Sequence, residues 1–234
     1  DRSGLRHDDP LSMSQGSARR VWLFDLDDTL HDASGWVFPA LKGAMNTYIQ
    51  AELGLDEDAA AALRYRYWRR YGATLTGLIR HHGVDMAHFL RETHRLPGLE
   101  AQVRSHVHDR AALARLRGRK LLLTNAPRAY AERVLQALGL SRSFERVLSI
   151  EDMSFAGHSR PKPDARMFRV VLARLRLRST DCVLVEDQLQ HQKAARALGL
   201  QTVWMQRWLR SKPHGRRPAY VGRRVHSLNA LRRF

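Results

Sequence analysis

The chain has 234 residues, of which 44% are hydrophobic and 27% are charged, and its formal net charge is +17. This length accommodates one α/β core with a small inserted domain, and the composition is typical of a globular protein. No apolar run approaches the ~20 residues that cross a bilayer, and residues 1–20 lack the apolar segment of a secretory signal. We therefore expect a cytoplasmic protein with no membrane partner. The single cysteine, Cys182, cannot form an internal disulfide, which agrees with a reducing compartment.

Residues 1–20 are polar and aperiodic, which predicts a flexible leader. The first predicted strand, residues 20–25, leads directly into Asp25, Asp27 and Thr29. Alternate side chains of a strand share one face, so both carboxylates would reach the same site if the chain stayed extended. One carboxylate could then attack phosphorus while the other moves protons. Because acidic turns often follow strands, this motif indicates a function only in combination with motifs further along the chain.

Residues 37–108 show helical periodicity, in stretches separated by Gly54, Gly72 and Gly83. They predict an all-helical insertion after the first core strand. From residue 109 onward, apolar strands alternate with single helices, which indicates a parallel sheet with right-handed crossovers. Functional side chains of such sheets lie at the carboxyl ends of the strands.

Three further motifs follow in order after FDLDDTL, namely LLLTN at 121–125, PKPD at 161–164 and VLVED at 183–187. This ordered set resembles the haloacid dehalogenase superfamily. Within that superfamily the chain is similar to the pyrimidine 5'-nucleotidase branch, through YGATLTGL at 71–78 and AARALGLQTVWM at 194–205. The resemblance covers roughly residues 20–205.

The resemblance implies an α/β fold, with a Rossmann-like parallel sheet flanked by helices and an all-helical cap domain inserted into it. The implied core comprises residues 21–36 and 109–234, and the implied cap comprises residues 37–108. A cap of this kind covers the phosphate site and contacts the leaving group.

The roles of two aspartates follow from phosphoryl chemistry and from the resemblance. Asp25 would attack phosphorus in line and form an aspartyl-phosphate. Asp27 would protonate the leaving oxygen and later accept a proton from the attacking water. Dehalogenases of the superfamily lack an acid at the position of Asp27, because a halide needs no proton. The sequence therefore favours phosphoester hydrolysis over dehalogenation.

The resemblance also implies a Mg²⁺ cofactor and a set of phosphate ligands. A phosphoryl group beside two aspartates requires positive charge and hydrogen-bond donors, and Mg²⁺ prefers hard oxygen ligands. The implied metal ligands are Asp25, the backbone carbonyl of Asp27, and Asp187, with Glu186 in support. The implied phosphate ligands are Thr124, Asn125 and Lys162, while Thr29 would orient Asp27. Gln188 and His191 depart from the family pattern, which usually has a small residue and an asparagine there.

Substrate choice would depend on the cap segment from Tyr65 to Leu78. We interpret Tyr67 and Trp68 as residues that pack cap helices together, and Tyr71 and Thr74 as candidate substrate contacts. The predicted partner is a small phosphorylated metabolite, in the first place a pyrimidine nucleoside 5'-monophosphate such as UMP or CMP.

Two alternatives remain at this point. The first is a broad phosphatase of sugar phosphates. The second belongs to another class of protein, a catalytically weakened nucleotide- or RNA-binding protein, because residues 206–234 carry nine Arg or Lys and no Asp or Glu. Such a surface would also bind polyanions nonspecifically through phosphate contacts.

Overall fold

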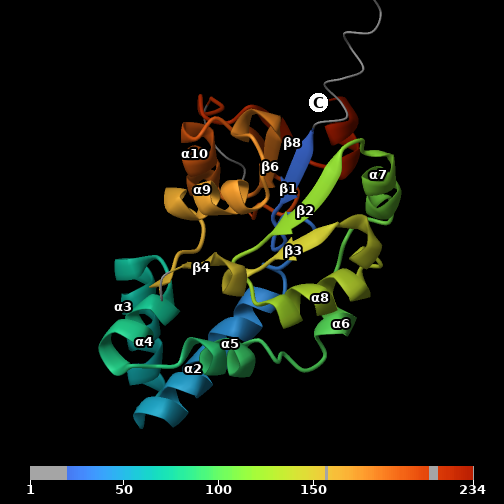
Figure 1. The fold of residues 1–234 in the computed structure, drawn as a ribbon. Helices are drawn as coiled ribbons and strands as arrows, with labels where there is room; N and C mark the ends of the chain where they lie inside the picture. The colour runs from blue at the N-terminus through green and yellow to red at the C-terminus, as the bar shows by residue number, and fades with distance from the viewer. Residues whose placement is uncertain (1–19, 156–157, 211–215, 234) are drawn as a thin grey trace, which may run out of the picture.

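A six-stranded parallel sheet forms the centre of the computed structural model, which describes residues 20–155, 158–210 and 216–233 (Figure 1). The strand order is β3-β2-β1-β6-β7-β8. The strands are β1 (Val21–Phe24), β2 (Arg119–Leu123), β3 (Arg146–Leu148), β6 (Cys182–Glu186), β7 (Gln201–Met205) and β8 (Arg223–Val225), beside a short antiparallel pair, β4 (Ser154–Phe155) and β5 (His158–Ser159). The predicted α/β class and parallel sheet are confirmed. The predicted leader lies outside the described residues, apart from Arg20.

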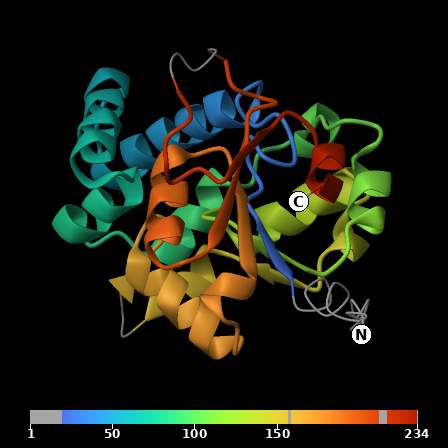
Figure 2. The ribbon, with the colours of Figure 1, turned by 90° about the horizontal axis from the view of Figure 1, so that it is seen from above.

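Helices cover both faces of the sheet, as Figure 2 shows from above. They are α7 (Asp109–Arg115) and α8 (Arg128–Ala137) on one face, and α9 (Ala165–Arg174) and α10 (Leu189–Ala197) on the other. Alternate residues of β1 enter the two hydrophobic clusters, with Trp22 and Phe24 on the α8 side and Leu23 on the α9 side. Burial on both faces explains why the central strands are nearly continuous runs of leucine and valine.

The segment between β1 and β2 is helical, as predicted. It contains α2 (Val37–Leu53), α3 (Glu57–Tyr71), α4 (Thr74–His82), α5 (Met86–Thr93) and the short α6 (Leu99–Gln102). Gly54, Gly72 and Gly83 end the first three of these helices in the left-handed conformation, at φ of 62, 76 and 65°. Glycine adopts that conformation without a Cβ clash, which is why these residues separate the helices.

Helices α2 to α5 form a third hydrophobic cluster, which includes Ile49, Leu78 and Phe89, and Ile150 of the core also joins it. Tyr67 is buried in this cluster, as predicted, and its ring packs against Gly77 so closely that a Cβ there would lie 2.2 Å from a ring carbon. The prediction for Trp68 is wrong, because 53% of that residue is exposed. One residue along a helix rotates the side chain by about 100°, which turns Trp68 away from the face that Tyr67 occupies.

The last part of the predicted cap range packs elsewhere. Leu96, Leu99 and Val103 join the cluster beneath the sheet together with Phe24. The two chain segments that connect the helical insertion to the core run side by side, because Asp32 N donates to Arg104 O at 3.0 Å and Ser105 Oγ donates to Leu30 O at 2.9 Å.

The carboxyl-terminal segment completes the sheet edge with β8 and a 3-10 helix, Leu228–Arg233. Two of its arginines bind acidic residues of the core: Arg207 forms a bidentate pair with Asp109, and Arg210 contacts Asp32 at 2.7 Å. No helix among the described residues has the length and apolarity that a membrane crossing requires.

Candidate active site

Three adjacent central strands deliver the predicted site residues to one edge of the sheet. β1 lies between β2 and β6, and Phe24 is in register with Leu122 on one side and Val185 on the other. Asp25 continues the β1 ladder by donating its N–H to Val185 O at 3.0 Å. Thr124 follows β2, Asp187 follows β6, and both lie at the same edge as Asp25.

Among the described residues, three buried carboxylates form a cluster that could bind a metal ion. Asp25, Glu186 and Asp187 each offer an oxygen, and these oxygens all lie within 4.8 Å of one another. Burial, reinforced by Glu186, raises the pKa of Asp25 to about 8 and that of Asp187 to about 10. Carboxylates crowded in this way need a cation to remain ionised. An all-oxygen, acidic donor set is that of a Mg²⁺ site.

Lys162 supplies positive charge inside the same cluster. Its Nζ atom lies 2.7 Å from Asp25 Oδ1 and 2.7 Å from Glu186 Oε2, and only 1% of its side chain is exposed. Burial raises the pKa of Glu186, but the charge of Lys162 outweighs it and holds that pKa far below its ordinary value. Glu186 is therefore the carboxylate that stays ionised without a metal.

The two predicted phosphate ligands after β2 differ in what they contact. The Thr124 hydroxyl accepts a hydrogen bond from Ala126 N at 3.0 Å, which leaves its own proton available to a phosphate oxygen. The Asn125 side chain is engaged at both ends by the backbone of Lys162, with distances of 3.0 and 2.9 Å. In this structure Asn125 therefore holds the lysine loop, whereas the sequence predicted a side chain that donates to phosphate.

Thr29 was predicted to orient Asp27, and the structure corrects this. Its hydroxyl donates to Asp25 Oδ2 at 3.3 Å. The chain does not stay extended, because Leu30 N bonds to Leu26 O at 2.8 Å and Asp28 adopts a positive φ of 56°. This turn brings Thr29 back over Asp25, four residues earlier.

Asp27 is held by two residues that sequence reasoning missed. Tyr130 donates its hydroxyl to Asp27 Oδ1 at 2.6 Å, and His31 Nε2 lies 2.8 Å from the same oxygen. Burial and the charge of Asp27 raise the pKa of Tyr130 well above its ordinary value, so its hydroxyl remains a donor. Tyr130 lies on the apolar face of α8 with Val134, which predicts a core residue, and no local pattern relates it to an aspartate 103 residues away.

The two departures from the family pattern both contact the acidic pair. The Gln188 side-chain amide donates to Asp187 Oδ2 at 2.7 Å, and His191 Nδ1 lies 3.1 Å from Glu186 Oε2. These side chains therefore occupy positions directly beside two members of the carboxylate cluster.

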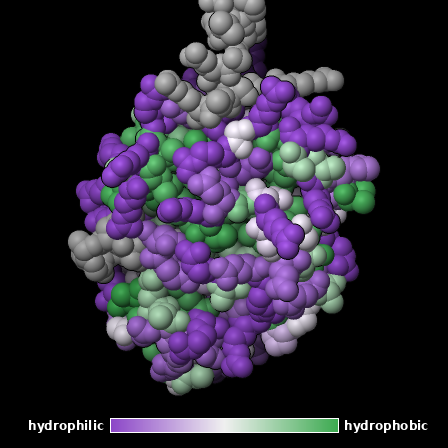
Figure 3. Space-filling model, turned by 45° about the vertical axis from the view of Figure 1, so that its right-hand side comes forward, coloured by the Kyte–Doolittle hydropathy of each residue, from purple (hydrophilic) through white to green (hydrophobic). Residues whose placement is uncertain are grey.

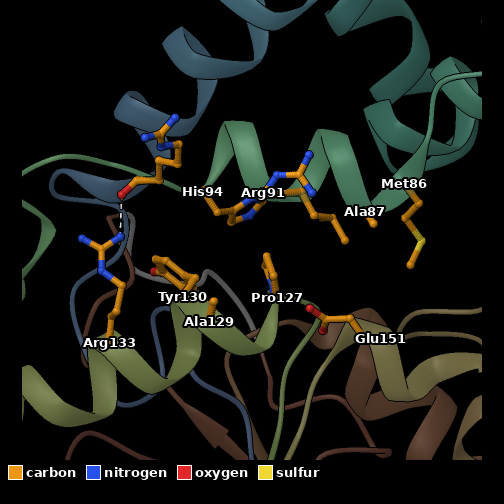
Figure 4. A pocket seen from close by; sticks show the side chains of 11 residues that line it. Met86, Ala87, Arg91, His94, Pro127, Ala129, Tyr130, Arg133 and Glu151 are labelled. Atoms are coloured by element: carbon orange, nitrogen blue, oxygen red, sulfur yellow. Dashed lines mark hydrogen bonds between the residues drawn. The ribbon is translucent and has the colours of Figure 1, made fainter.

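A cavity of about 460 Å³ lies between α5 of the insertion and α8 of the core (Figure 4). Arg91 of α5 and His94, the residue directly after α5, line it on one side, and Tyr130 and Arg133 of α8 line it on the other. Tyr130 thus lines this cavity while its hydroxyl contacts Asp27. The candidate substrate residues are not among those that line it: Tyr71 OH pairs with His81 at 2.6 Å, and the hydroxyl of the buried Thr74 donates to Arg64 O at 3.2 Å.

Comparison with known proteins establishes the family. Residues 20–199 match the family model of haloacid dehalogenase-like hydrolases. The chain belongs to this family. The matched region contains every residue of the carboxylate cluster, together with Thr124, Asn125 and Lys162. The finer resemblance to pyrimidine 5'-nucleotidases receives no support from these comparisons.

Two curated relatives of this haloacid dehalogenase-like hydrolase are named for phosphate metabolism and for a phosphatase activity, respectively. The first, Phosphate metabolism protein 8 of Saccharomyces cerevisiae, is 26% identical over 212 residues, which cover 82% of this chain and 63% of the yeast protein. The second, Glyceraldehyde 3-phosphate phosphatase of Methanocaldococcus jannaschii, is 26% identical over 206 residues and 82% of its own length, covering 77% of this chain.

Solved structures share the fold of this hydrolase. A HAD phosphatase from Thermococcus onnurineus superimposes with a TM-score of 0.62 at 19% identity, covering 92% of this chain and 96% of that chain. The putative HAD-hydrolase YfnB from Bacillus subtilis, bound to magnesium, gives a TM-score of 0.58 at 20% identity, covering 92% and 97% of the respective chains. At these identities the likeness concerns the fold.

Proposed function

We propose that this hydrolase is a Mg²⁺-dependent phosphatase that releases phosphate from small phosphomonoesters through an aspartyl-phosphate on Asp25. The observation that carries the proposal is the presence of two acids with different surroundings. Asp25 lies in a buried cluster with Lys162, whereas the side chain of Asp27 is 18% exposed. A dehalogenase has no use for the second acid. Two relatives with names from phosphate chemistry support the same reading.

The residues divide the reaction between them. An oxygen of Asp25 attacks phosphorus while the bond from phosphorus to the leaving-group oxygen breaks. Asp27 donates a proton to the leaving-group oxygen. Lys162 and the Thr124 hydroxyl bind the phosphoryl oxygens, and Thr29 donates to Asp25. Water then attacks the aspartyl-phosphate as Asp27 takes the proton. Mg²⁺ would neutralise charge on the phosphoryl group. Its ligands would be Asp25, Asp187 and the backbone carbonyl of Asp27, and Glu186 would support them.

We propose sugar phosphates and similarly small phosphorylated metabolites as the substrate class. The relative from Methanocaldococcus jannaschii is named for such a substrate. The cavity beside Tyr130 is lined by Arg91, Arg95 and Arg133, by one acidic residue, Glu151, and by apolar side chains. A pyrimidine nucleotide is the second candidate. Its support was the resemblance of the YGATLTGL and AARALGLQTVWM segments. Tyr71 and Thr74 of the first segment form hydrogen bonds within the insertion.

The binding-protein alternative rests on surface charge. Figure 3 shows a largely hydrophilic face, and the carboxyl-terminal segment is rich in arginine. Arg207 and Arg210 are nevertheless paired with Asp109 and Asp32. This pairing leaves less free positive charge for a polyanion than the sequence alone indicates.

The test is magnesium-dependent phosphate release from glyceraldehyde 3-phosphate, simple sugar phosphates, UMP, CMP and AMP. Asp25→Asn should abolish turnover, whereas Asp58→Asn, at an exposed position of α3, should not change it. Preference for UMP and CMP would favour the nucleotidase. No turnover of any ester, together with salt-sensitive binding of RNA, would contradict the phosphatase proposal and favour the binding protein.

A further inference from the structure

Two donors converge on a single oxygen of Asp27. Tyr130 OH and His31 Nε2 lie 2.6 and 2.8 Å from Asp27 Oδ1, and 3.5 Å from each other. Tyr130 and His31 are 1% and 0% exposed. A carboxylate oxygen only accepts hydrogen bonds, so His31 must carry its proton on Nε2 when Asp27 is ionised. Its other ring nitrogen, Nδ1, has no partner among the described residues, which agrees with that tautomer.

The second oxygen of Asp27 is in a different situation. Oδ2 accepts no hydrogen bond from any residue that the structure describes, and the Asp27 side chain is partly exposed. When two donors occupy Oδ1, a proton that Asp27 carries must reside on Oδ2. The contacts therefore distinguish the two oxygens of the acid and fix the rotation of the carboxyl group.

We propose that Tyr130 and His31 are positioning residues that fix Asp27 so that its Oδ2 atom faces the leaving oxygen. The inference rests on the proposed phosphatase function. In the transfer step the proton moves from Oδ2 to the leaving oxygen as the phosphorus–oxygen bond breaks and the bond from Asp25 forms. Tyr130 and His31 keep their own protons throughout, so both act through Asp27.

Tyr130 also relates this arrangement to the α5–α8 cavity. Its ring lines the cavity and meets the His94 ring edge-on, with centroids 5.7 Å apart, while its hydroxyl reaches Asp27. One side chain therefore shapes the wall of the cavity and orients the acid. A purely structural role for Tyr130 would depend on the ring, whereas positioning depends on the hydroxyl.

Leaving-group dependence separates the two roles. An alkyl phosphate needs a proton on its departing oxygen, whereas p-nitrophenolate leaves without one, and kcat/KM reports the steps up to departure. General acids contribute about 10²–10⁴-fold to a rate. We therefore expect the loss in kcat/KM that Tyr130→Phe causes to be roughly tenfold larger, or more, for propyl phosphate than for p-nitrophenyl phosphate. Tyr48→Phe is the matched control, because Tyr48 is also buried and bonds a histidine, His88, but lies in the insertion.

A second background makes the test decisive. In the Asp27→Asn variant, adding Tyr130→Phe should lower kcat/KM for propyl phosphate little further, because the acid is already absent. His31→Gln retains an amide donor and should retain more of the alkyl-ester rate than His31→Leu. Equal losses on both esters, or full additivity with Asp27→Asn, would overturn the positioning role while leaving the phosphatase proposal intact. A wild-type protein that hydrolyses neither ester would contradict both.

Discussion

The Nζ atom of Lys162 lies 2.7 Å from Oε2 of Glu186, and both side chains are almost completely buried. Removing the lysine charge leaves the Asp25 and Glu186 carboxylates, whose side chains are 9% and 0% exposed, together without a compensating charge. A buried pair that loses one partner costs about 3–5 kcal/mol of stability. The strength of this contact makes Lys162 a structural residue as well as a proposed phosphate ligand.

We therefore expect Lys162→Met to lower the free energy of unfolding by about 3–5 kcal/mol at pH 8 without metal. The loss should be smaller at pH 5.5, because the freed carboxylates can take up protons there. Urea unfolding in the presence of a chelator measures both values. Lys120→Met is the control, since Lys120 donates to Gly118 O rather than to an acid. Equal losses for the two variants would contradict the assignment.

Magnesium binding should tighten as pH rises from 6 to 8. The pKa of Asp25 is raised to about 8 and that of Asp187 to about 10, so the metal-free site holds protons that the ion must displace. Titration calorimetry in buffers of different ionisation enthalpy counts the protons released. Asp187→Asn should lose binding, and Asp58→Asn should retain it. A pH-independent affinity would count against this prediction.

His94 should make the fold sensitive to mild acid. Burial lowers its pKa to about 4, whereas an unfolded histidine titrates near 6.5, so the unfolded chain binds the extra proton between these values. Its contribution to stability is complete above pH 6.5 and is lost as pH falls towards 4. Between pH 7.5 and 5 the wild type should lose about 1–2 kcal/mol relative to His94→Gln. Urea midpoints of both proteins at the two pH values test this, and parallel curves would refute it.

Gly77 should tolerate no side chain. An added Cβ would lie 2.2 Å from the ring of Tyr67, so Gly77→Ala should cost about 1–3 kcal/mol through overpacking of the insertion. Gly43→Ala offers the comparison, because Gly43 lies within α2 and a Cβ there would meet no atom within 4 Å beyond its chain neighbours and the adjacent backbone of its own helix. That variant should gain about 0.5–1 kcal/mol from helix propensity. Thermal unfolding of both variants measures the opposite signs; a destabilised Gly43→Ala would indicate that the packing argument is incomplete.

The sequence predicted those parts of the protein that depend on strand order. Asp25, Thr124 and the Glu186–Asp187 pair follow apolar strands, and parallel strands bring their carboxyl ends together. The glycines of the insertion likewise marked the helix ends. Lys162 lies in a loop and not at a strand end. It was predicted from the family resemblance, through the position of its motif in the ordered set.

Contacts that depend on a turn or on distant packing could not be predicted. The partner of Thr29 changed because the chain turns at Leu26. The hydroxyl of Tyr130 reaches Asp27 across the fold, and nothing local in α8 distinguishes it from a core tyrosine. Trp68 differs from Tyr67 only by its rotation about the helix axis, and aromatic composition alone does not reveal that rotation.

The chain leaves the core near Leu30 and Asp32 and returns at Arg104 and Ser105, and hydrogen bonds join these two crossings. The insertion also packs on the core beside these crossings, because Val37, Leu99 and Val103 lie in the same hydrophobic cluster as Phe24. The hydrogen-bonded crossings and this shared cluster are therefore the places through which a change in the insertion would reach the strand that carries Asp25.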